Sequence, residues 1–125
     1  MAALATTNLG NTNLSATTFG LGGGFLYVQS FATGVATVQR ALELGVRYFD
    51  TSPHYGKGVS QGILGAALRD RDEEYVLATK IGHFATPSHF RSADAIRAQF
   101  DENLLLLQRK HVNVLQIHEA DWHQW

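Results

Sequence analysis

Four side chains in this sequence have the chemistry needed to reduce a carbonyl group by hydride delivery: Asp50, Tyr55, Lys80 and His118. Such a reaction needs a proton donor for the developing alkoxide and a hydrogen bond to the carbonyl oxygen. A tyrosine hydroxyl can give the proton, and a nearby ammonium eases its loss by stabilising the phenolate. An aspartate can pair with that ammonium, and a neutral histidine can donate to the carbonyl oxygen.

Three of these residues each follow a predicted β-strand. Asp50, Lys80 and His118 come after apolar runs at residues 46–49, 75–79 and 112–117. Because the carboxyl ends of parallel strands meet on one face of a barrel, we expect these side chains to converge. Tyr55 lies five positions after Asp50 in a Pro- and Gly-containing loop, so it can fold back over them.

Each residue also has a purely structural explanation. Asp50 and Lys80 would then form a structural ion pair, Tyr55 would anchor a loop, and His118 would be a buried histidine below a turn. The placement of three ionisable residues at three strand ends favours the catalytic interpretation over these separate ones.

The pattern between these residues predicts alternating strands and helices around a parallel sheet. A further strand is expected at Thr18–Leu21, ended by Gly22, Gly23 and Gly24. A glycine run lets a loop turn tightly or a ligand approach the backbone, although this one lacks the spacing of known phosphate loops. The missing spacing favours a turn for the glycine run, and Gly22 and Gly23, with Asp50, are kept as candidate cofactor contacts.

Three helices complete the predicted pattern. The first is capped by Thr33 and ends at Gly45, the second runs over residues 60–68, and the third runs from Ser92 to about Arg109. The expected core positions of the third helix are Ile96, Phe100, Leu104 and Leu107. Leu105 and Leu106 fall off that stripe, where they would meet a neighbouring helix, meet another chain or lie on the surface.

Composition narrows the function classes. The chain has 10 Lys and Arg against 11 Asp and Glu, so nothing indicates a nucleic-acid partner. It has no cysteine, which excludes disulfides and thiolate metal sites and fits the cytoplasm. Residues 1–16 form a polar lead-in without the pattern of a signal peptide, and we expect no membrane segment.

Several segments resemble the hallmark segments of the aldo-keto reductase superfamily, in order and spacing. They are ALELGVRYFDTSPHYG, SQGILGAAL, EEYVLATKIG and HVNVLQIHEAD. The catalytic Asp, Tyr, Lys and His of that family fall on Asp50, Tyr55, Lys80 and His118. Within the superfamily, DTSPHYG and LQIHEADW look most like the aldose 1-dehydrogenase branch, which includes galactose dehydrogenases.

The resemblance implies an α/β fold of the (β/α)8 type that binds NADP(H) or NAD(H) without a metal, and a carbonyl or sugar substrate. Family members bind the cofactor pyrophosphate and adenosine mainly through loops after the last two strands. The chain departs from the family at Gln61 and Gly62, where Glu and a larger residue are common. It also departs at Asn103–Leu106, where a Ser-Leu-Arg-Arg-like run is frequent.

The chain has 125 residues, about half of the roughly 250 in a complete barrel. We expect a single domain over 1–125, a half barrel with four strands and three helices. Its two outer strands would be open edges. We therefore expect a fragment of a longer protein, a protomer that pairs with another chain, for which a homo-oligomer is possible, or a product that folds poorly. A catalytically silent half barrel acting as an interaction module is the alternative function.

A metal hydrolase is a third possibility, because many His, Asp and Glu residues fall near one face. No HxH or HExxH spacing supports it, so we predict no metal site. The residues considered as ligands were His54, His83, His89, His118, Glu119, Asp121 and His123.

Overall fold

The computed structural model describes residues 3–71, 74–82 and 92–118. Its centre is a four-stranded parallel sheet in the order β3-β4-β5-β6. These strands are β3 (Leu21–Gly22), β4 (Tyr48–Asp50), β5 (Val76–Ile81) and β6 (Val114–Ile117). The helices are η1 (Leu26–Val28), α1 (Phe31–Glu43), α2 (Val59–Leu68) and α3 (Ala93–Leu107). The four parallel strands and three α-helices are those of the predicted half barrel.

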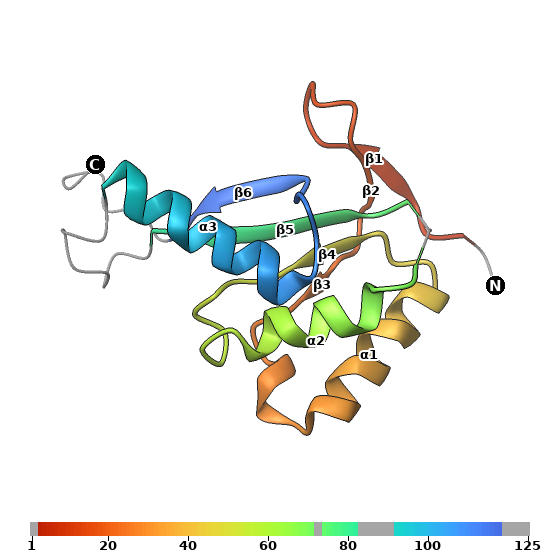
Figure 1. Ribbon diagram of the computed structural model, residues 1–125. Helices are drawn as coiled ribbons and strands as arrows, with labels where there is room; N and C mark the ends of the chain where they lie inside the picture. Colours follow the sequence, from red (N-terminus) through yellow and green to blue (C-terminus); the bar gives the residue numbers. More distant parts are fainter. Residues whose placement is uncertain (1–2, 72–73, 83–91, 119–125) are drawn as a thin grey trace.

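The hydrophobic core lies between the sheet and the helices, which cover one side of it (Figure 1). Phe49 of β4 and Leu77 of β5 point to that side, and both are buried. Helix α1 contributes Val38 and Leu42, spaced four residues apart on one face. Packing against the helices explains why Phe49 and Leu77 are apolar, since side chains that point to the covered side of a sheet are buried.

An antiparallel hairpin precedes the sheet and was missed by the sequence prediction. It consists of β1 (Thr6–Asn8) and β2 (Ser15–Thr17), within and just beyond the segment taken as a polar lead-in. Its Thr17 Oγ1 accepts a 2.9 Å hydrogen bond from the backbone N–H of Arg47, just before β4. The hairpin therefore lies at the end of the sheet opposite the carboxyl ends of the strands (Figure 1).

Several predicted boundaries were wrong by a few residues. The strand expected at Thr18–Leu21 is β3 at Leu21–Gly22. Helix α1 is capped by Ser30, whose Oγ accepts from the N–H of Thr33, so Thr33 lies inside the helix. Strand β5 continues to Ile81, which puts Lys80 inside the strand rather than after it. The cap of α3 at Ser92 is confirmed.

The outer surface of α3 and β6 is only partly covered. Leu106 packs over Gly58 at the start of α2, whereas Leu105 is 76% exposed. On β6, Leu115 and Ile117 point to the helix side of the sheet and remain 44% and 53% exposed. No helix among the described residues is long and apolar enough to cross a membrane.

Helix α2 approaches α3 closely at Gly65. A Cβ at this position would lie 2.6 Å from the backbone oxygen of Leu106 and 2.9 Å from that of Leu107. A Cβ at Gly62, almost one turn earlier, would meet only a ring atom of Phe31, at an ordinary contact distance of 3.6 Å. The two glycines of one helix therefore differ in what an added methyl group would meet.

We predict that Gly65→Ala lowers the free energy of unfolding by about 1–3 kcal/mol, because two backbones must move apart. The matched variant Gly62→Ala should be neutral or stabilising by up to about 1 kcal/mol, because alanine favours helix. Urea unfolding followed by circular dichroism compares the two. Equal stabilities of the two variants would contradict the close approach of α2 to α3.

Candidate active site

Strand register places three of the four predicted catalytic residues on the side of the sheet away from the helices. Asp50 of β4 lies beside Ala78 of β5, and Lys80 lies beside Gln116 of β6. In-register residues of parallel neighbours point the same way, and side chains alternate along a strand. Asp50, Lys80 and His118, two positions after Gln116, therefore share one side. The backbone N–H of His118 extends the ladder with a 2.8 Å bond to Ile81 O.

Lys80 and Asp50 form an ion pair on this side. The distance from Lys80 Nζ to Asp50 Oδ1 is 2.5 Å, and the two side chains are only 13% and 22% exposed. Lys80 Nζ also donates to the backbone oxygen of Thr51 at 2.9 Å. The ammonium is thus held in a fixed place by one charge and one carbonyl.

Tyr55 and His118 complete the group. Lys80 Nζ lies 5.1 Å from the centre of the Tyr55 ring. The rings of Tyr55 and His118 are 5.8 Å apart and nearly perpendicular, at 85°. Tyr55 reaches this position because the turn after β4 is closed by hydrogen bonds from Tyr55 N to Ser52 O and from Ser60 N to Tyr55 O. The structure therefore brings all four predicted residues together.

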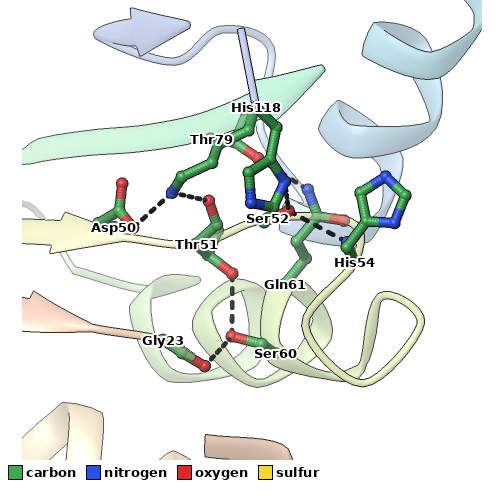
Figure 2. Close-up of polar contacts among 10 residues, drawn as sticks. Gly23, Asp50, Thr51, Ser52, His54, Ser60, Gln61, Thr79 and His118 are labelled. Atoms are coloured by element: carbon green, nitrogen blue, oxygen red, sulfur yellow. Dashed lines mark hydrogen bonds and ion pairs between the residues drawn. The ribbon is translucent and has the colours of Figure 1, made fainter. Parts of the chain in front are cut away.

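Ser52, which the sequence prediction missed, lies directly beneath His118 (Figure 2). Its Oγ is 2.9 Å from Nδ1 of His118 and accepts from the backbone N–H of His54 at 3.1 Å. The His54 ring also lies near His118, with centroids 5.5 Å apart. The DTSPHYG loop is thus tied to the end of β6 through a buried hydroxyl.

The glycine run is anchored to the same loop. Gly23 N donates to Asp50 O at 2.6 Å, and Gly23 O accepts from Ser60 Oγ at 2.9 Å. A Cβ at Gly23 would come within 2.5 Å of Ser60 Oγ, so close packing requires glycine here. Gly22 differs, because no atom lies within 4 Å of where its Cβ would be. Of the two glycines predicted as cofactor contacts, Gly22 faces open space beside Asp50, whereas the Gly23 backbone is bonded within the protein.

A second buried polar group supports Lys80 from the helix side. Gln61 of α2 is fully buried, and its Nε2 donates to Thr79 Oγ1 and to Asn103 Oδ1, each at 2.9 Å. Asn103 Nδ2 in turn donates to the backbone oxygen of Lys80 at 2.9 Å. Gln61 Oε1 is buried and has no hydrogen-bond partner in the described part of the chain. This chain of bonds joins α2, β5 and α3, and Figure 2 shows its Gln61–Thr79 part.

Tyr48 is a second phenol on the open side, two positions before Asp50. Burial raises the pKa of its hydroxyl above the usual 10.0, and the Asp50 carboxylate raises this pKa further. Tyr48 therefore stays protonated at neutral pH and is a poor candidate for proton transfer.

Metal binding finds no geometric support in the described residues, where no three His, Asp or Glu side chains are grouped closely enough to hold an ion. Of the ligands considered from the sequence, His54 and His118 are described. The others, His83, His89, Glu119, Asp121 and His123, lie outside the described residues.

Comparison with known proteins connects this geometry to a family. The profile of the aldo/keto reductase family matches residues 18–123, nearly the whole chain. This chain belongs to the aldo/keto reductase family. It is 36% identical over 121 residues to L-galactose dehydrogenase of Arabidopsis thaliana, covering 91% of this chain and 38% of that protein. The chain thus spans well under half the length of this curated relative.

Solved structures of this family have the same fold. An aldo-keto reductase from Bacillus halodurans, in its holo form, superimposes with a TM-score of 0.81 at 24% identity. The match covers 94% of this chain and 41% of that one. A Klebsiella pneumoniae aldo/keto reductase in complex with NADP and acetate matches at 22% identity with a TM-score of 0.74, over 86% and 38% of the two chains. The fold of this chain is therefore a partial aldo-keto reductase barrel.

The Gln61 network explains two departures from the family pattern together. A Glu at position 61 would present two acceptor oxygens, one of them facing the Asn103 oxygen that now accepts from Gln61. Asn103 cannot turn its amide around without losing its bond to Lys80 O. A Ser at position 103 has a hydroxyl that can donate to either side chain. Gln61 and Asn103 are therefore a matched pair.

We predict that Gln61→Glu alone costs about 3 kcal/mol of unfolding free energy, since it buries a carboxylate against an acceptor. The double variant Gln61→Glu with Asn103→Ser should cost less than the sum of the single variants by about 1 kcal/mol or more. Denaturant unfolding of the four proteins measures this coupling. Strictly additive costs would show that the two positions are independent.

Proposed function

We propose that the protein is a nicotinamide-dependent oxidoreductase that moves a hydride between NADP(H), or NAD(H), and an aldehyde, a ketone or C1 of an aldose. The observation that carries the proposal is the meeting of Tyr55, Lys80 and His118 beside Asp50. Family membership and the likeness to L-galactose dehydrogenase support the reaction type and favour a sugar substrate.

Each side chain has one role in this proposal. Tyr55 gives its hydroxyl proton to the substrate oxygen in reduction and takes it back in oxidation. The Lys80 ammonium, 5.1 Å from the Tyr55 ring, stabilises the phenolate that remains, and Asp50 holds that ammonium in place. His118 donates a hydrogen bond to the substrate oxygen, where negative charge develops.

The residues present fit the reacting end of such a cofactor. When bound, the nicotinamide supplies or accepts the hydride. Open space in front of Gly22, next to Asp50, suits a flat ring lying close to the backbone. The NADP complex of the Klebsiella relative supports this choice of cofactor. Since the family binds the pyrophosphate and adenosine through loops after its last two strands, we expect the 125-residue chain alone to bind NADPH only weakly.

We predict that Tyr55→Phe lowers the rate of NADPH-dependent turnover of aldehydes or aldoses at least about 100-fold, because the proton donor is lost. The matched control is Tyr27→Phe, which removes the hydroxyl of a partly exposed tyrosine packed on Gly56. Cofactor absorbance at saturating substrate measures both variants. Unchanged turnover in Tyr55→Phe would refute the proposed role.

A second candidate function is assembly through the uncovered surface of β6. Leu115 and Ile117 expose apolar side chains next to a strand edge, which suits a second copy of this chain. Gel filtration of the chain and of Leu115→Lys distinguishes the candidates. A stable assembly without Tyr55-dependent turnover would favour this function over catalysis.

A cytoplasmic location belongs to the same proposal. A chain with no cysteine does not depend on an oxidising compartment for its stability. The nicotinamide cofactor would be drawn from the same compartment.

A further inference from the structure

The side-chain oxygen of Ser52 has two hydrogen-bond partners among the described residues. The side chain is fully buried, and its Oγ contacts the backbone nitrogen of His54 and Nδ1 of His118. Among the residues that the structure describes, this oxygen has no other hydrogen-bond partner. The position of the hydroxyl hydrogen can therefore be worked out by counting donors and acceptors.

The count leaves one place for the hydrogen. A backbone N–H can only donate, so His54 uses a lone pair of the Ser52 oxygen and offers nothing in return. The remaining neighbour, Nδ1 of His118, is the single acceptor that the described part of the chain places within reach of the Ser52 hydroxyl. If Nδ1 carried a hydrogen instead, Ser52 would hold a buried hydroxyl without an acceptor, which folded proteins avoid.

We infer that Ser52 is the residue that fixes the tautomer of His118. The Ser52 hydroxyl donates to Nδ1, so the neutral imidazole carries its hydrogen on Nε2. The catalytic role of this tautomer rests on the proposed function, in which Nε2–H donates a hydrogen bond to the substrate oxygen. Ser52 itself touches no substrate and acts as a positioning residue.

The backbone also fixes both partners. His118 N is bonded to Ile81 O at 2.8 Å, which ties the histidine to the end of the sheet. Ser52 O accepts from Tyr55 N at 3.1 Å, so the same serine joins the turn that carries the proposed proton donor. One residue thus sets the hydrogen position on His118 and the start of the Tyr55 turn.

The test is the tautomeric state of His118 in the isolated protein, read from the 15N shifts of its two ring nitrogens in long-range 1H–15N spectra. His118→Gln identifies the signals. We expect wild-type protein to show Nε2 protonated and Nδ1 unprotonated at neutral to mildly alkaline pH. Protonated Nδ1 in the wild-type neutral ring would overturn the inference without needing a Ser52 variant.

Ser52→Ala should move the two nitrogen shifts toward each other, as a mixture of tautomers forms. Ser60→Ala is the control, because it removes another fully buried serine hydroxyl that does not contact His118. The control should leave the His118 shifts unchanged. Identical shifts in wild type and folded Ser52→Ala would also overturn the inference.

Turnover gives a separate measurement. Ser52→Ala should lower kcat in proportion to the fraction of the Nε2–H tautomer that is lost, about twofold for an even mixture, with a smaller effect on KM. If no carbonyl substrate is turned over at a saturating NADPH concentration, the proposed function fails while the nitrogen shifts still decide the tautomer. An unchanged kcat in a variant with mixed tautomers would show that the tautomer fixed by Ser52 does not affect turnover.

Discussion

The ion pair between Lys80 and Asp50 is the constraint on which the rest of the site depends. A mostly buried ammonium is costly unless a charge and further acceptors satisfy it, and here one carboxylate and the Thr51 carbonyl do so. The pair exists only because β4 and β5 align Asp50 with Ala78, two residues before Lys80. A slip of one residue would turn either side chain to the helix side of the sheet.

The sequence was sufficient to predict that Asp50, Lys80 and His118 meet, because the rule used is geometric, whereas Tyr55 was placed by its position in the loop after Asp50. Residues at the carboxyl ends of parallel strands share a face, whatever the details of packing. Strand and helix limits were less accurate, as with Lys80 inside β5 and Ser30 in place of Thr33 as the cap. Very short strands such as Leu21–Gly22 carry too few residues for a periodic pattern.

The hairpin and the buried polar residues could not be predicted for a different reason. The β1–β2 segment is polar and largely exposed, so it has no apolar alternation to mark it. Ser52 acquires its role from His118, which lies 66 positions away. Ser60 and Gln61 did leave a signal, since they are two polar residues at the start of an otherwise apolar helix. Their partners, however, follow from tertiary packing alone.

The matched pair under Lys80 also restricts how the sequence could have changed. Starting from the Glu and Ser common in the family, an amide at position 61 is compatible with a hydroxyl at position 103, which donates to either side chain. Replacing Ser by Asn first would instead place the Asn103 oxygen against a buried carboxylate. The geometry of Gln61 and Asn103 therefore lets an amide at position 61 tolerate either Asn or Ser at position 103, whereas a carboxylate at position 61 suits only Ser.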